Sequence, residues 1–537
     1  MNFINFMLNV VFSILFSVAL FYTDKINDLR GASLLKKSGV DIITTSDISS
    51  IFLIFIPVFL CVWFVLKNVK SFTIKRTLNL KDISVLKVGF CLFLFWFPFL
   101  LVFYPAPGMN DTYYILKYPM GCSVQHPFYY CMYLGILGKL SLKFFGTEAL
   151  GLFISVLLQM AFMAFSIGFS IKWIYEKLKN TFLAYVLIFY FAFLPIIGNY
   201  AIAAVKDTIF SVTLLLWIPF LYDVLVEKKS IVQDKLMKYY FIVISVLTLT
   251  MRNNGKYIFV VLALWLVFNY TKERRNIIKI SIICLILCSI PNFYLGVFGN
   301  RPQLLQEAVA VPMQQIARTI AVDGVVTEEQ KAYLNNWMPL EKIKKSYNVF
   351  TVDTIKWNND FNRKFFNSHS KEFFKYWSEI WTQNKKVYLE AWLLQTFGCW
   401  AVDTQDWIDQ SRFGFSLTHE ILKRGVTPSE NNKFKVGSFP ISQSVKETLG
   451  KYMFYNTDYI NPGNCFWITL FIGLILVNRK RYMELSVLLP ILLCWGTLIL
   501  AVPATFVYRY AFMYPLSLPF LILIPFISKE KLEDKNV

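Results

Sequence analysis

Long apolar runs separated by short basic segments form the main pattern of this chain. Runs of about 18 or more apolar residues are typical of membrane-spanning helices. Including several shorter runs, the apolar segments lie at about 3–22, 50–66, 88–106, 148–171, 181–203, 208–226, 239–251, 257–271, 278–296, 464–478, 484–502 and 511–528. We therefore predict an all-α polytopic membrane protein with about twelve transmembrane helices.

The basic segments between these runs orient the predicted spans. The loop 67–81 is rich in lysine and arginine, so the positive-inside rule places it in the cytoplasm and the end of the third run outside. A membrane crossing at 128–145 would invert every later basic loop. We therefore predict that 113–145 forms juxtamembrane helices in the outer interface, where Lys139 and Lys143 are tolerated. Both termini are then cytoplasmic.

This topology divides the chain into four parts. They are 1–87 with two N-terminal spans and a cytoplasmic basic loop, 88–296 as a membrane core with an outer loop at 107–147, 297–458 as a mainly helical extracytoplasmic domain, and 459–537 with the C-terminal spans and a cytoplasmic tail. In the third part, aromatic residues from Trp357 to Trp381 recur at helical spacing. We expect this stripe to pack on the membrane core; a lipid-facing surface is the alternative.

Composition agrees with a membrane protein. The 537 residues are 56% hydrophobic and only 16% charged, which is too little polar surface for a soluble protein of this size. The formal net charge of +20 could indicate nucleic-acid binding, but the basic residues lie in short clusters between apolar runs. That arrangement is typical of loops next to anionic lipid. We therefore expect membrane lipids as partners and no nucleic acid.

The sequence offers little support for metal or cofactor chemistry. Most of the nine cysteines fall inside apolar runs and are expected to pack there, while Cys122 and Cys131 could pair outside the cell. Three widely spaced histidines cannot form a usual zinc site, and no nucleotide-binding or hydrolase motif occurs in a plausible context. We predict no metal site and no cofactor.

Several polar residues fall at the predicted outer ends of the spans. They are Asp111, His126, Lys206, Asp207, Arg252, Asn253, Arg509 and Tyr510. Each has a simpler explanation: Lys206 and Asp207 could form an interfacial ion pair, Arg509 could extend to lipid phosphates, and Asp111 could cap a helix. Charges at membrane depth are costly, however, and are usually kept for ion pairs, ligands or catalysis. These residues come from four separate segments that the topology places on one face, and we therefore predict that they form a shared site.

These features resemble the GT-C class of membrane glycosyltransferases. The acidic residue of the first outer loop corresponds to PGMNDTYY, the juxtamembrane passage to HPFYYCMYLGILGKLSLKFFGTEA, and the Arg-Tyr start of a late span to VYRYAFMYPLSLPF. The finer pattern NDT, HP, KDT, RNNG, VPMQQIAR and NKKVYLEAWLLQTFGCW resembles an uncharacterised bacterial envelope family with this layout. The resemblance covers most of 88–530. Two features differ from the class. Two spans precede the span that leads into the first outer loop, and this loop has a single acidic residue, Asp111, instead of the frequent Asp-Glu pair.

The resemblance implies a transferase in the bacterial cell membrane with an extracytoplasmic active site. Asp111 would be the catalytic base, and Arg509, Lys206 and Arg252 would meet the phosphate of a polyprenyl-phosphate sugar donor. His126 would bind the phosphate or position Asp111, and the outer domain would select an envelope glycan acceptor. A divalent metal is compatible with the class but has no support in this sequence. The alternatives are a flippase or carrier, a ligase or polymerase of lipid-linked glycans, and a non-enzymatic scaffold.

Overall fold

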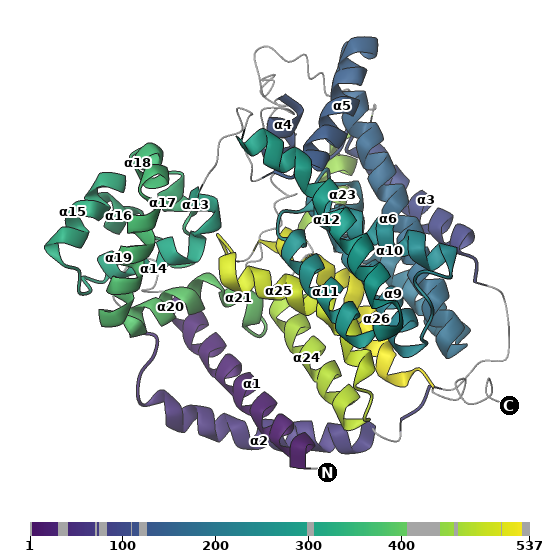
Figure 1. Cartoon of the computed structure of the whole chain (residues 1–537), viewed down its shortest axis with the longest axis horizontal. Helices are drawn as coiled ribbons and strands as arrows, with labels where there is room; N and C mark the ends of the chain where they lie inside the picture. Colours follow the sequence, from purple (N-terminus) through teal and green to yellow (C-terminus); the bar gives the residue numbers. More distant parts are fainter. Residues whose placement is uncertain are drawn as a thin grey trace.

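The computed structural model describes residues 3–30, 41–69, 72–74, 83–108, 110–117, 126–297, 305–404, 441–455, 460–505 and 507–528 (Figure 1). Its described residues form helices and no β-strand. One large bundle occupies the right of Figure 1, a smaller helical unit lies at its left, and an N-terminal helix pair lies along its lower edge. The predicted all-α architecture is confirmed in this coarse form.

The N-terminal pair consists of α1 (Phe3–Arg30) and α2 (Asp47–Val69), which pack on each other and on α24 (Pro462–Asn478). Only 6% of the apolar window of α2 is buried, so most of its side chains are available to lipid. In contrast, α1 buries a polar stripe at helical spacing, formed by Asn5, Asn9, Ser13 and Ser17. Small and hydroxyl-bearing residues of this kind allow membrane helices to approach closely.

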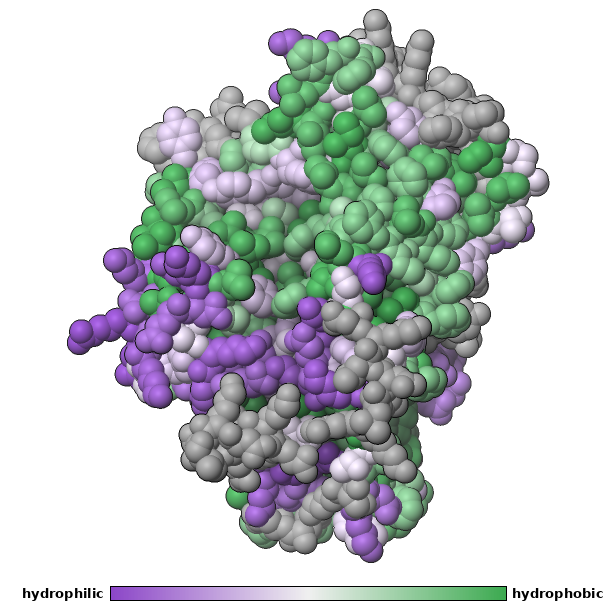
Figure 2. Space-filling view, turned by 90° about the vertical axis from the view of Figure 1, so that its right-hand side faces the viewer, coloured by the Kyte–Doolittle hydropathy of each residue, from purple (hydrophilic) through white to green (hydrophobic). Residues whose placement is uncertain are grey.

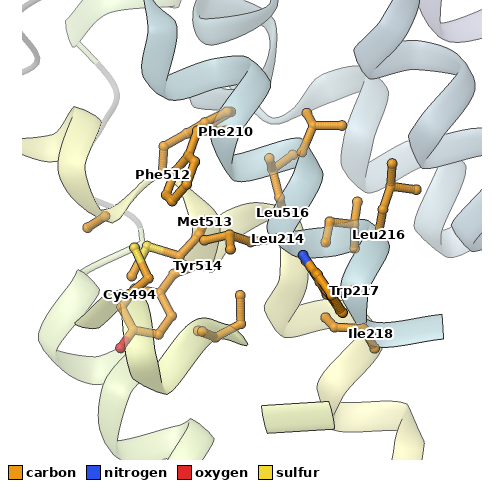
Figure 3. Close-up of a cluster of buried hydrophobic side chains, with 14 of the residues drawn as sticks. Phe210, Leu214, Leu216, Trp217, Ile218, Cys494, Phe512, Met513, Tyr514 and Leu516 are labelled. Atoms are coloured by element: carbon orange, nitrogen blue, oxygen red, sulfur yellow. The ribbon is translucent and has the colours of Figure 1, made fainter. Parts of the chain in front are cut away.

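The bundle contains most of the remaining apolar helices. They are α3 (Val85–Val102), α4 (Asn110–Lys117), α5 (Phe128–Phe145), α6 (Ala149–Leu178), α7 (Thr181–Phe193), α8 (Pro195–Ile202), α9 (Lys206–Leu221), α10 (Lys235–Met251), α11 (Gly255–Asn269), α12 (Arg274–Val297), α25 (Leu489–Ala501) and α26 (Met513–Leu523). The central helix is α9, whose apolar window is 94% buried. Figure 3 shows Phe210 and Trp217 of α9 in the same cluster as Phe512, Tyr514 and Leu516 of the last span.

Seven segments in the described part of the chain are long and apolar enough to cross a membrane. They are Phe3–Leu29, Asp47–Val69, Val85–Val102, Ala149–Leu178, Lys206–Val226, Met483–Ala501 and Tyr508–Phe526. An eighth results if α7 and α8 count as one span, while α11 and α24 are shorter apolar helices. The chain is therefore a membrane protein by these criteria, and the number twelve stays a prediction.

The predicted span at 181–203 consists of two helices. Helices α7 and α8 are bent by 60° at Pro195. Proline lacks a backbone N–H and disfavours helical geometry in the preceding residue, and Leu194 accordingly has extended backbone angles (φ −70°, ψ 116°). The bend matters because α8 leads directly into the start of α9.

The segment predicted to be juxtamembrane forms two separate helices, α4 and α5. Helix α5 runs beside the first half of α6, where the Tyr133 hydroxyl donates a hydrogen bond to the carbonyl of Ser155. A Cβ atom at Gly151 would lie 2.2 Å from the carbonyl oxygen of Leu137, so the close approach of these helices requires glycine. Cys122 lies outside the described residues, and its pairing with Cys131 stays a prediction, as does the interfacial position of both helices.

The smaller unit has its own hydrophobic core. Its helices are α13 (Leu305–Ala308), α14 (Ala310–Ala321), α15 (Glu328–Trp337), α16 (Leu340–Ser346), α17 (Asp353–Lys356), α18 (Arg363–Ser368), α19 (Ser370–Gln383) and α20 (Lys385–Gln395). The fully buried Trp337 contacts Phe361, Phe366 and Phe373 in this core. The expectation that the aromatic stripe packs on the membrane core is therefore wrong, because its inward side covers the core of its own unit.

Several contacts join this unit to the rest of the molecule, among them the backbone hydrogen bond from Val352 to the carbonyl of Pro503 (3.1 Å). The following helices α21 (Phe397–Trp400) and α23 (Gln443–Tyr455) contribute to the core of the large bundle. Near α2, Glu390 accepts hydrogen bonds from Arg318 (2.7 Å) and from the backbone N–H groups of Ile42 (2.9 Å) and Ile43 (3.1 Å). The segment just before α2 is therefore bonded to α14 and α20.

Charged contacts also join helix ends at the side of the bundle opposite α4. Lys177 at the end of α6 lies 3.3 Å from Asp223, just beyond α9, and Arg481 beyond α24 donates to the carbonyl of Pro525 at 2.7 Å. These contacts lie at the C-terminal ends of α6, α9, α24 and the last span, which the predicted topology places on the same side of the membrane. The face in Figure 2 has a broad hydrophobic area, with hydrophilic residues gathered toward the lower left. Which side is cytoplasmic stays a prediction.

Candidate functional site

Four short segments meet at the α4 end of the bundle. They are the start of α4, the connection between α8 and α9, the turn between α10 and α11, and the turn Tyr508–Ala511 that precedes α26. These segments contain the sequence motifs NDT, KDT, RNNG and RY. Ion pairs and hydrogen bonds connect them.

Hydrogen bonds from two sides hold the connection between α8 and α9. The Thr112 hydroxyl donates to the carbonyl of Ala204 (2.6 Å), and the N–H of Ala204 donates to the carbonyl of Pro107 (2.9 Å). From α6, the Gln159 amide donates to the carbonyl of Ala203 (2.7 Å). These bonds fix the start of α4 against the start of α9, so that Asp111 and Lys206 face each other.

Asp111 lies between two cationic side chains. Nη1 of Arg509 is 3.0 Å from Oδ2 of Asp111, and Nζ of Lys206 is 3.8 Å from the same oxygen. The ammonium group of Lys206 also lies 3.3 Å from Nδ1 of His126, which accepts a hydrogen bond if Lys206 donates. The side chain of Asp111 is 36% exposed, whereas those of Arg509 and Lys206 are 12% and 15% exposed. The carboxylate is thus the accessible member of this group.

The surrounding charges control the protonation of Asp111. Its burial alone would raise the pKa, but Lys206, Arg509 and His126 favour the ionised form and outweigh that effect. The pKa of Asp111 therefore lies well below the ordinary value for a carboxyl group. Asp111 is ionised at neutral pH, and in this arrangement it is a weak base.

A second ion pair lies deeper in the same site. Nη1 of Arg252 is 3.2 Å from Oδ1 of Asp207, a charge contact without hydrogen-bond geometry, and the Asp207 side chain is only 1% exposed. Asp207 lies in the first turn of α9 and Arg252 follows the last turn of α10, so each charge lies at the favourable end of a helix dipole. The turn also depends on Gly255, because a Cβ there would lie 1.8 Å from the carbonyl oxygen of Thr248.

Tyr510 connects the two ion pairs. The guanidinium carbons of Arg252 and Arg509 each lie 5.0 Å from the centre of the Tyr510 ring, within the range of cation–π attraction. Arg509 also donates a hydrogen bond to the Tyr510 hydroxyl at 3.2 Å. Three cations and two carboxylates therefore form one continuous group. Tyr510 further lines a small apolar pocket with Trp495, Leu498 and Tyr514.

The structure thus brings together seven of the eight residues singled out in the sequence: Asp111, His126, Lys206, Asp207, Arg252, Arg509 and Tyr510. Asn253 lies in the same turn as Arg252, and its role stays a prediction. The sequence analysis missed Thr112 and Gln159, which hold the connection between α8 and α9. A polar glutamine inside the apolar run 148–171 was the available signal for Gln159.

Within the described ranges, no three histidine, cysteine, aspartate or glutamate side chains gather in a way that could hold a metal ion. The site instead offers positive charge beside a single accessible carboxylate. Such a group can bind an anion or assist proton transfer.

Comparison with known proteins gives one match. No curated protein and no solved structure matches the chain. A family described as a family of unknown function, DUF6020, matches residues 113–536. That range includes six of the seven connected residues and begins two positions after Asp111. Because the match covers well over half of the sequence, the chain belongs to the DUF6020 family.

Proposed function

We propose that this protein is a GT-C-like membrane glycosyltransferase. It transfers a sugar from a polyprenyl-phosphate donor to a glycan or glycopolymer acceptor of the bacterial cell envelope, with its site on the extracytoplasmic side. The observation that carries the proposal is the contact of Asp111 with Arg509 and Lys206, which come from three distant segments of the chain. A carboxylate beside paired cations is the combination that this reaction requires.

The proposed reaction uses these groups in distinct roles. An acceptor hydroxyl attacks the anomeric carbon of the donor sugar and gives its proton to Asp111. The bond between the sugar and the phosphate oxygen breaks, and its electron pair leaves with the lipid phosphate. The phosphate changes from a diester with one negative charge to a monoester with more, so Arg509 and Lys206 stabilise the charge that develops.

A lipid-linked glycan carrier is the main alternative function. A carrier would need polar groups along a path through the bilayer, and the polar stripe of α1 is the feature that could supply one. Its residues are buried, however, and bond within the protein: Asn5 donates to Asn478, Ser13 to Asn9, and Ser17 to the carbonyl of Ser13. This stripe therefore supports helix packing better than it supports transport.

The proposal is tested with purified protein and a panel of radiolabelled polyprenyl-phosphate sugars, with envelope glycan fragments as acceptors. We expect transfer from at least one donor, and loss of a general base in Asp111→Asn should reduce the rate by about 10²–10⁴-fold. Asp323→Asn is the matched control, because it removes one carboxylate from an exposed ion pair in the smaller unit. Equal rates for folded wild type and Asp111→Asn would refute the role of Asp111, and failure of the whole panel would refute the proposed activity.

A further inference from the structure

We propose that Asp111 occupies the phosphate position of the site when no donor is bound, and that donor binding displaces it. The inference rests on the proposed function in that it takes a lipid phosphate as the ligand. It adds that the catalytic carboxylate competes with that ligand for the same cations. Asp111 is thus both an internal anion and the later base.

The geometry of the carboxylate supports this competition. A single oxygen, Oδ2, faces both Arg509 (3.0 Å) and Lys206 (3.8 Å), as an oxygen of a bound phosphate would. The two cations are largely buried, so they need an anionic partner at all times. Asp111 is 36% exposed and can move away without leaving a buried charge of its own.

The other carboxylate of the site does not have this property. Asp207 is 1% exposed and lies at the start of a central helix, where Arg252 neutralises it. A ligand cannot reach Asp207 without opening the bundle. The structure therefore assigns to Asp111 the exchange with the ligand phosphate, whereas Asp207 remains a fixed charge.

Exchange of partners resolves a conflict between the proposed roles. While Asp111 contacts Arg509 and Lys206, its pKa is low and it accepts a proton poorly. When a donor phosphate takes over these cations, Asp111 loses the interactions that lower its pKa and becomes a better base. Donor must then bind before an acceptor can be activated. After transfer, Asp111 releases the acceptor's proton to water, and its return to the cations as a carboxylate helps to expel the lipid phosphate.

The test measures binding to the full-length protein in detergent, without any sugar transfer. The probes are geranylgeranyl phosphate, inorganic phosphate and the uncharged geranylgeraniol. An internal competitor that occupies the site nine times in ten lowers apparent affinity about tenfold. We therefore expect Asp111→Asn to bind geranylgeranyl phosphate about tenfold more tightly than wild type, with geranylgeraniol unaffected. If Asp111→Asn also binds inorganic phosphate more tightly, the site recognises phosphate generally. If only the binding of geranylgeranyl phosphate improves, the site recognises a phosphate that carries a lipid chain.

Further variants and a high-salt measurement distinguish direct competition by Asp111 for the two cations from effects on folding or on the long-range field. Asp111→Glu keeps the competing charge and should bind like wild type, and Asp323→Asn should not change affinity. Asp111→Ser, which keeps a hydroxyl in the first turn of α4, repeats the test if Asp111→Asn does not fold. The gain should persist at about 0.5 M salt, where the field of a distant charge is screened.

Unchanged or weaker phosphate binding by Asp111→Asn and Asp111→Ser would overturn the inference, as would a gain that disappears at high salt or an equal gain in Asp111→Glu. Failure of every protein to bind either phosphate would overturn it too. Tighter binding in Asp111→Asn together with no transfer by wild type from any donor would leave the inference in place and refute the glycosyltransferase.

Discussion

Arg509 lies at the start of the last apolar segment, where long basic side chains commonly extend toward lipid phosphates. Its side chain is only 12% exposed and contacts Asp111 and Tyr510 inside the protein. A basic residue that serves only as a lipid anchor would remain at the surface. The contacts therefore favour a role in the site.

The shape of the Arg509 side chain gives the first prediction. A guanidinium binds two oxygens of a phosphate in one plane, which an ammonium group cannot reproduce. Loss of one charge-assisted hydrogen bond costs about 1.5–3 kcal/mol, so Arg509→Lys should weaken binding of geranylgeranyl phosphate by about 10- to 100-fold. The measurement is a binding titration, with the exposed Arg363→Lys as control. Equal affinity of Arg509→Lys and wild type would assign Arg509 to anchoring alone.

A neighbouring prediction concerns Thr112. Its hydroxyl holds α4 against the connection between α8 and α9, and a neutral hydrogen bond of this kind contributes about 1 kcal/mol. Thr112→Val should lower the free energy of unfolding by about that amount and should reduce transfer, because Asp111 and Lys206 lose their alignment. Thr112→Ser keeps the hydroxyl and should retain both properties. Full activity in Thr112→Val would mean that the remaining contacts position Asp111 sufficiently.

At the scale of elements, the pair of Asp207 and Arg252 joins the start of α9 to the end of α10. Asp207→Ala leaves the mostly buried Arg252 without its partner, which typically costs about 3–5 kcal/mol. We expect that loss in the free energy of unfolding in detergent. Replacing both residues by Leu and Met should recover much of it, because no buried charge then remains.

A double-mutant cycle measures this coupling. The single variants Asp207→Leu and Arg252→Met supply the other corners of the cycle. Additive effects of the two single substitutions would contradict the contact as the main interaction of either residue.

The sequence indicated which residues matter at this scale but not which of them meet. Apolar runs and basic loops are local patterns, so they placed the motifs NDT, KDT, RNNG and RY at one end of the bundle. The contact between Asp111 and Arg509 joins residues 398 positions apart, and no local pattern determines such a partner. Likewise, the spacing from Trp357 to Trp381 identified a buried face without identifying the core that it covers. The bend at Pro195 follows from the missing backbone N–H of proline, whereas the apolar run 181–203 by itself predicts only its length.

At the scale of the whole molecule, the proposed topology makes a prediction about the two ends of the bundle. Lys139 on α5 and Lys235 at the start of α10 are both exposed, and the basic-loop analysis places them on opposite sides of the membrane. Cysteine at position 139 should react with a membrane-impermeant thiol reagent added outside whole cells, and cysteine at position 235 should not.

The background for this experiment has Cys61, Cys91 and Cys122 replaced by serine, because the first two are exposed and the predicted topology places the third in the outer loop. Permeabilised cells provide the control, in which both positions should react. Reaction of both positions in intact cells would refute the topology, and with it the assignment of the site to the outer side.

Glu390 has a further consequence for how an acceptor reaches the site. Both of its carboxylate oxygens accept hydrogen bonds, one from Arg318 of the same smaller unit and the other from the backbone ahead of α2. Swinging the smaller unit away would remove the two backbone N–H groups from this buried carboxylate, and a hydrogen bond to a charged group contributes about 1.5–3 kcal/mol. Together with the backbone hydrogen bond from Val352 to the carbonyl of Pro503, these bonds hold the smaller unit in place, which argues against a lid that opens freely. If the acceptor is a glycan polymer, as we propose, a unit held in this way would favour access by chain ends over access by chain interiors.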